Sequence, residues 1–175
     1  MGPYGELLAA GHLQTLEFFA VGLRDVSDIS VDQDELLYNA SVLAHFAQVS
    51  RFADTDLPTP ANLGDVFDHF VADTTLLGDS EMMESAGAQC LLLTGFFETQ
   101  MRRRYNIRWY VQLGTGFYKR AAAQESAAKK ARLLGTIASH FEYWRERQAR
   151  LSRDLDDRSR GRLLLAPPRR TETDD

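Results

Sequence analysis

Apolar residues recur at helical spacing in every long segment of this chain, and this periodicity restricts the fold more than any other feature of the sequence. No segment alternates between apolar and polar residues at the period of a strand. An apolar fraction of 44% in 175 residues is enough for one independent core. We therefore expect an all-α protein, a single-domain bundle of about six helices over residues 1–157, followed by a flexible mixed-charge tail over residues 158–175.

Capping residues indicate where several helices begin. Asp32 and Glu35 have the spacing of a capping box, and Asn106 is a typical N-cap residue. Pro60 is typical of a first helical turn, and its helix is expected to reach about Val71. Together with the periodicity, these signals place helix starts near residues 6, 33, 60, 80, 106 and 126.

The segment from about residue 80 to 101 is predicted to be a buried central helix. It is apolar on all sides between Ala86 and Phe97, which is typical of a helix enclosed by others. The next helix has a clean apolar face but contains Gly114 and Gly116, each of which costs roughly 1 kcal/mol of helix propensity relative to alanine. We expect close helix packing to explain both glycines.

The last predicted helix, over about residues 126–155, is long and carries a heptad pattern. Its apolar residues follow alternating steps of three and four with one polar position, which is the pattern of a coiled-coil seam. The same spacing is typical of a helix that lies along a bundle, so this alternative stays open. We expect self-association, as a homodimer or other homo-oligomer, through the seam formed by Ile137, Phe141, Trp144, Gln148 and Leu151.

Charge is divided unequally along the chain. Residues 1–100 carry two basic and sixteen acidic residues, whereas residues 101–150 carry twelve basic and three acidic residues. Such a division is typical of a basic binding face, but it also arises when acidic and basic helices pack against each other within one fold.

The segment 102–110 is the strongest candidate for a binding surface, because it combines four arginines with three aromatic residues. Arginines bind phosphates, and aromatic rings stack on bases. The net charge of −5 is nevertheless poor for general nucleic-acid affinity, so we expect a protein partner first and nucleic acid second. The alternative is that the arginines pair with the acidic first half while the aromatic rings are core. The candidate interaction surface consists of Arg102, Arg103, Arg104, Arg108 and Lys119.

The sequence offers no catalytic set, no metal site and no cofactor motif. The four histidines are scattered, and none accompanies a sequence signature of a nucleophile and its base. Asp65, Asp68, His69 and Asp73 could face one point, but helical di-metal proteins need paired Glu-x-x-His motifs, which this chain lacks. We therefore expect this acidic cluster to be a solvated face.

Compartment and membrane signals point to a cytoplasmic protein. Cys90 is the only cysteine, so no intrachain disulfide is possible and a reducing compartment is expected. The first six residues lack the features of a signal peptide. The longest apolar stretch has about twelve residues, whereas a membrane span needs about twenty, so no membrane contact is expected.

The segment from about residue 76 to 121 resembles a group of uncharacterised bacterial all-helical proteins. The resemblance rests on Leu-Leu-Leu-Thr-Gly-Phe-Phe at residues 91–97 and on Tyr110, Gly114 and Tyr118 in the next helix. It implies an aromatic-rich helical fold with tightly packed glycines, and no activity is known for the group.

These patterns together favour a non-enzymatic helical interaction module, which self-associates through its last helix and contacts a protein partner through the segment 102–110. A nucleic-acid-binding regulator that uses the same arginines is the alternative. An enzyme with an interhelical pocket is the third hypothesis, because pockets in bundles form without local sequence motifs.

Overall fold

The structure, a computed structural model, describes residues 3–52 and 79–164. The regular structure of these residues is helical, which confirms the predicted all-α fold. The predicted helix at 60–71 and the acidic cluster at 65–73 lie outside the described residues. The described helices are α1 (Pro3–Val26), α2 (Gln33–Phe52), α4 (Ser80–Thr94), α5 (Glu98–Met101), α6 (Ile107–Gln124), α7 (Ala128–Ser139) and α8 (Phe141–Leu164).

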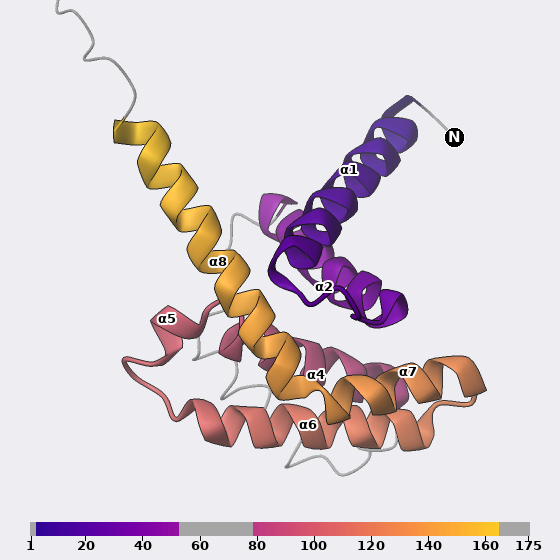
Figure 1. Cartoon of the computed structure of the whole chain (residues 1–175). Coiled ribbons are helices and arrows are strands. Elements are labelled where there is room, and N and C mark those ends of the chain that lie inside the picture. The colour runs from indigo at the N-terminus through magenta and orange to yellow at the C-terminus, as the bar shows by residue number, and fades with distance from the viewer. Residues whose placement is uncertain (1–2, 53–78, 165–175) are drawn as a thin grey trace, which may run out of the picture.

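The helices form a layer with a helix pair above it. In the layer, α6 packs along α4 and against α7, and α1 and α2 pack against each other above the layer (Figure 1). The last helix, α8, leaves the layer and passes beside α1 (Figure 1). The main core lies where these parts meet and joins Leu23 of α1, Leu43 of α2, Leu91 of α4, Phe117 of α6 and Trp144 of α8.

Three of the predicted helix starts are confirmed by their caps. The Asp79 carboxylate accepts a hydrogen bond from the backbone N–H of Glu81 at 2.9 Å, at the start of α4. The Asn106 side chain accepts from the backbone N–H of Trp109 at the start of α6. At the start of α2, Asp32 accepts from the backbone N–H of Glu35 at 3.0 Å, as the capping box predicts.

The central helix is buried as expected, but it is shorter than predicted. Every residue of α4 from Cys90 to Thr94 is buried. The helix ends at Thr94 rather than near residue 101, and the separate short helix α5 follows. A Cβ at Gly95 would lie 3.0 Å from Cβ of Gln148, so the break at Gly95 lets α8 approach the end of α4 closely.

The two glycines of α6 have different explanations. A Cβ at Gly114 would lie 2.6 Å from Cζ of Phe141 and 2.7 Å from Cβ of Cys90, so the expectation of close packing is right for this position. A Cβ at Gly116 would meet nothing within 4 Å, so the same expectation is wrong there.

The last predicted helix is two helices, not one. The helix α7 ends at Ser139 and α8 begins at Phe141, and α8 turns away from the direction of α7 (Figure 1). The hydroxyls of Thr136 and Ser139 each donate to the carbonyl oxygen four residues earlier, at 2.9 and 3.1 Å. Such side-chain bonds bend helices, which gives a local reason for the change of direction at His140.

The predicted self-association seam is buried inside a single chain. Its polar position, Gln148, donates from Nε2 to Oδ1 of Asn39 on α2 at 3.1 Å. Contact with a second copy through these side chains would require opening the core, so packing within the bundle explains their heptad spacing, and self-association stays a prediction. The seam residues are each at most 4% exposed: Ile137, Phe141, Trp144, Gln148 and Leu151.

The C-terminal helix is longer than predicted. It extends to Leu164, so the predicted tail that starts at residue 158 begins inside α8. The remainder of that tail, residues 165–175, lies outside the described residues. No described helix combines the length and apolar content needed to cross a membrane.

Candidate functional site

The arginine surface, defined as Arg102, Arg103, Arg104, Arg108 and Lys119, lies at the α5–α6 connection and on the outer side of α6. All five residues are exposed. Arg102 pairs with Glu98, with Nη2 and Oε1 2.5 Å apart. The other four form no ion pair with any described residue. Within the described part of the chain, the acidic first half therefore does not neutralise them.

The arginine surface places positive charge at the start of α6 and along one side of this helix. Arg108 and Lys119 are eleven residues apart, which is about three helical turns, so they share one side of α6 about 16 Å apart. The first turn of α6 carries no acidic residue, and the helix dipole favours anions at that end. The arrangement fits an extended anion.

An aromatic ring accompanies these charges at the start of α6. Trp109 is 40% exposed, and its ring packs edge to face on Tyr110 with the centroids 4.8 Å apart. Tyr110 is buried and packs with Leu93 and Met101. The expectation that both rings are core is thus right for Tyr110 and wrong for Trp109, which presents part of its surface to solvent.

A second candidate site, which the sequence did not reveal, is a histidine that is held by a buried carboxylate. Glu35 is 5% exposed, and it accepts a hydrogen bond from Nε1 of Trp144 at 2.7 Å. The same carboxylate lies 3.0 Å from Nδ1 of His140, whose side chain is half exposed. A capping box also predicts that the Glu35 side chain binds back to the backbone N–H of Asp32. This part of the prediction is wrong, because the Glu35 carboxylate turns into the core.

The Glu35–His140 pair borders a pocket of about 310 Å³, which Ser30 and Tyr143 also line. A histidine held by a carboxylate is the arrangement of a general base. No described nucleophilic side chain donates a hydrogen bond to His140. The pair links the joint between α7 and α8 to α2.

A second polar chain joins four helices beside an open pocket of about 860 Å³ between α2 and α7. The hydroxyl of Tyr38 lies 3.1 Å from the hydroxyl of Tyr118 and 3.1 Å from Oε1 of Glu84. Glu84 also binds Nζ of Lys130 at 2.9 Å, and this bond raises the pKa of Lys130. Burial raises the pKa of both tyrosines, so their hydroxyls stay protonated and join the hydrogen-bonded chain as neutral groups.

Cys90 is expected to be unreactive in the folded protein. The thiol is 1% exposed, and burial raises its pKa to about 12 from 9.0. Because the thiolate is the nucleophile, a thiol reagent added at mildly alkaline pH should modify the unfolded chain and leave the folded chain unmodified. Absorbance of the released reagent group, in buffer and in concentrated guanidinium, measures this. Rapid modification of the folded protein would contradict it.

The same pKa shift predicts a loss of stability at alkaline pH. The folded-state pKa lies above the unfolded value, so the stabilising contribution of the neutral thiol is complete below pH 9 and falls as the pH rises towards about 12. Denaturant unfolding of wild type and Cys90→Ala across this range isolates the contribution of the thiol, because the alanine variant lacks the titrating group.

No protein-family model, curated protein or solved structure matches this chain. The assignment of function therefore rests on the geometry of the chain itself.

Proposed function

We propose that this protein is a non-enzymatic interaction module that binds single-stranded nucleic acid through the arginine surface. The observation that supports this most directly is the exposure of Arg103, Arg104 and Arg108 without ion pairs to described residues, beside the exposed ring of Trp109. Single-strand-binding proteins combine a positive track for the backbone with a ring for base stacking. A duplex keeps its bases stacked, so the ring favours an unpaired strand.

An acidic protein surface is the second candidate for the same arginines, and it keeps the role of a protein-interaction module. This chain already pairs arginines with carboxylates, as Arg102 and Arg145 both bind Glu98. Carboxylate pairing does not need Trp109. The contribution of that ring therefore separates the two candidates.

Charge reversal of the surface should abolish most of the binding. We expect the triple variant Arg103→Glu, Arg104→Glu, Arg108→Glu to bind a labelled oligouridine at least about tenfold more weakly than wild type at low salt. If each arginine contacts one phosphate, the slope of log affinity against log salt should become shallower by about two. Fluorescence anisotropy over a salt series measures both quantities.

The matched control reverses three other exposed basic residues, Lys129, Arg132 and Arg150, and changes the net charge by the same amount. It should retain most of the affinity, because screening limits the effect of distant surface charges. Trp109→Ala should cost about 1–3 kcal/mol of binding free energy if the ring stacks on a base. The proposal would be contradicted if both triple variants lost the same affinity, or if wild type did not bind the oligonucleotide at low salt. The acidic protein surface would be favoured if Trp109→Ala kept its affinity and oligoglutamate competed for binding.

A further inference from the structure

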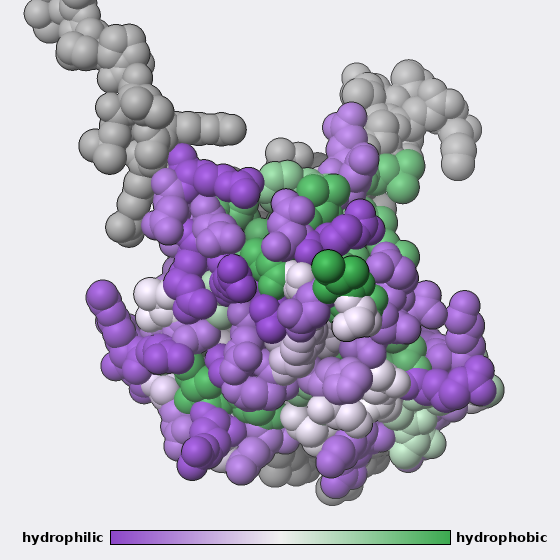
Figure 2. All heavy atoms as spheres, in the orientation of Figure 1, coloured by the Kyte–Doolittle hydropathy of each residue, from purple (hydrophilic) through white to green (hydrophobic). Residues whose placement is uncertain are grey.

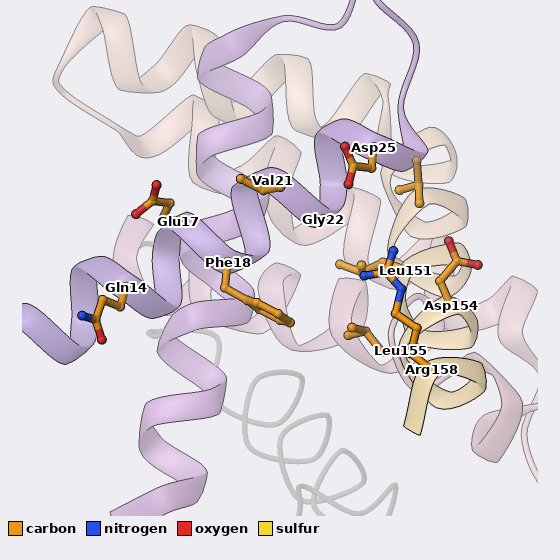
Figure 3. A pocket seen from close by; sticks show the side chains of 11 residues that line it. Gln14, Glu17, Phe18, Val21, Gly22, Asp25, Leu151, Asp154, Leu155 and Arg158 are labelled. Carbon is orange, nitrogen blue, oxygen red and sulfur yellow. The ribbon is translucent and has the colours of Figure 1, made fainter. Parts of the chain in front are cut away.

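A groove of about 350 Å³ lies between α1 and α8 (Figure 3), and none of its lining residues belongs to the arginine surface. The two helices meet closely at its base, where a Cβ at Gly22 would lie 2.8 Å from Cδ1 of Leu151. The side chain of Phe18 extends from α1 towards α8, and Leu155 faces it from α8 (Figure 3). The groove is thus built from the sides of two helices.

Apolar surface is concentrated along this side of α1. Phe18 and Val21, which line the groove, are 54% and 47% exposed, although both are large apolar residues. Figure 2 shows apolar side chains gathered between α8 and α1, flanked by hydrophilic side chains on α8. Exposed apolar residues that cluster and have a polar rim are typical of an interaction site.

Both walls have the residue spacing of a helix-packing face. On α1 the lining residues Gln14, Phe18, Val21 and Asp25 follow steps of four, three and four. On α8 the lining residues at 151, 155 and 158 follow steps of four and three. This spacing turns one side of each helix towards the groove above the contact of Gly22 with Leu151, and such paired faces are the kind that a further helix packs on.

The charged residues around the groove favour a positively charged binding partner. Glu17, Asp25 and Asp154 line the groove against one basic residue, Arg158, so the rim carries a net negative charge. An occupant with lysine or arginine beside its apolar residues complements this rim, whereas an acidic occupant is repelled.

A second copy of the chain is a poor occupant on these grounds. Two copies of the same rim would bring like charges together in a symmetric contact. The described basic helices α6 and α7 place their apolar faces in their own core, through Phe117, Leu134 and Ile137. The segment at 60–71, an expected helix of this chain, carries Asp65 and Asp68 and no lysine or arginine, so its charge matches the rim instead of complementing it.

The geometry points to a binding site for a basic amphipathic helix of a partner protein, held in the groove between α1 and α8. The apolar stripe of that helix packs on Phe18, Val21 and Leu155, and its basic residues lie against Asp25 and Asp154. This site is separate from the arginine surface, so peptide binding in the groove can be tested independently of nucleic-acid binding.

A display library of amphipathic helical peptides tests this site, selected on the full-length protein and counter-selected on Phe18→Glu. We expect enriched peptides to share apolar residues at positions i, i+3 or i+4, and i+7, together with an excess of lysine and arginine. Their affinity should fall at least about tenfold for Phe18→Glu and for the double variant Asp25→Lys, Asp154→Lys. Anisotropy of labelled peptides measures these ratios.

Leu37→Glu is the matched control, because Leu37 is a similarly exposed apolar residue on α2, outside the groove. It should leave peptide affinity within about twofold of wild type. Circular dichroism melting checks that each variant is folded, and oligouridine binding should be the same in all of them. Three results overturn the proposal: no enrichment on wild type over Phe18→Glu, enrichment of acidic peptides, or a wild-type dimer that Phe18→Glu converts to a monomer, since a second copy would then cover the groove.

Discussion

Gly114→Ala is expected to destabilise the fold by about 2 kcal/mol, although alanine is the better helix former. The added methyl would lie 2.6 Å from the ring of Phe141 and 2.7 Å from Cβ of Cys90. Cβ atoms follow the backbone, so α4 and α6 would have to separate to relieve the second contact. Overpacking of this kind outweighs the gain of roughly 1 kcal/mol in helix propensity.

Gly116→Ala is the control for this prediction, because it makes the same chemical change two residues further along the same helix. No atom lies within 4 Å of the added Cβ, so the propensity gain is unopposed and stability should rise by about 0.5–1 kcal/mol. Urea unfolding followed by circular dichroism measures both variants. Equal effects of the two substitutions would mean that α4 and α6 do not meet closely at Gly114.

Trp144→Ala is expected to cost about 3–5 kcal/mol of unfolding free energy, the larger of the two effects. The indole is fully buried in the main core, and its N–H donates to the buried carboxylate of Glu35 at 2.7 Å. The alanine variant leaves a cavity and removes one of the two side-chain hydrogen bonds that satisfy this carboxylate. Native proteins have about 5–15 kcal/mol of stability in total, so much of the fold's margin would be lost.

The variant Trp144→Phe separates the two contributions. It keeps most of the ring and removes the N–H donor, so its cost should be near 1.5–3 kcal/mol, the approximate value of a hydrogen bond to a charged group. Light scattering on wild type and Trp144→Ala tests the alternative origin of the heptad pattern. If the alanine variant changed a dimer into a monomer while keeping its unfolding free energy, Trp144 would belong to an interface between copies.

Features of the fold that depend on neighbouring residues could be predicted from the sequence. The starts of α2, α4 and α6 follow from Asp32, Asp79 and Asn106, because a capping bond spans only two or three residues. The apolar periodicity also predicted which side of the segment 126–155 is buried. It did not give the partner of that side, because a heptad pattern is the same whether the neighbour is another helix of the chain or a second copy.

Features that depend on distant residues could not be predicted. The break at Gly95 accommodates Gln148, and the joint at His140 is held by Glu35, 105 residues away in the sequence. Gly114 and Gly116 look alike in the sequence, but only the first faces another helix. The sequence identified the basic residues of the arginine surface, but it could not show which of them form ion pairs, because this depends on the positions of the acidic helices.

The joint at His140 sets the direction of the long helix α8. The helix is 24 residues long, which corresponds to about 36 Å, and it begins beside the Glu35 carboxylate. A rotation of about 10° at this joint would move the far end of α8 by about 6 Å. The α8 wall of the groove lies along that arm, so the width of the space beside α1 depends on the angle at the joint. Because Gln148 packs against Gly95, the same angle also sets how closely α8 approaches the end of α4.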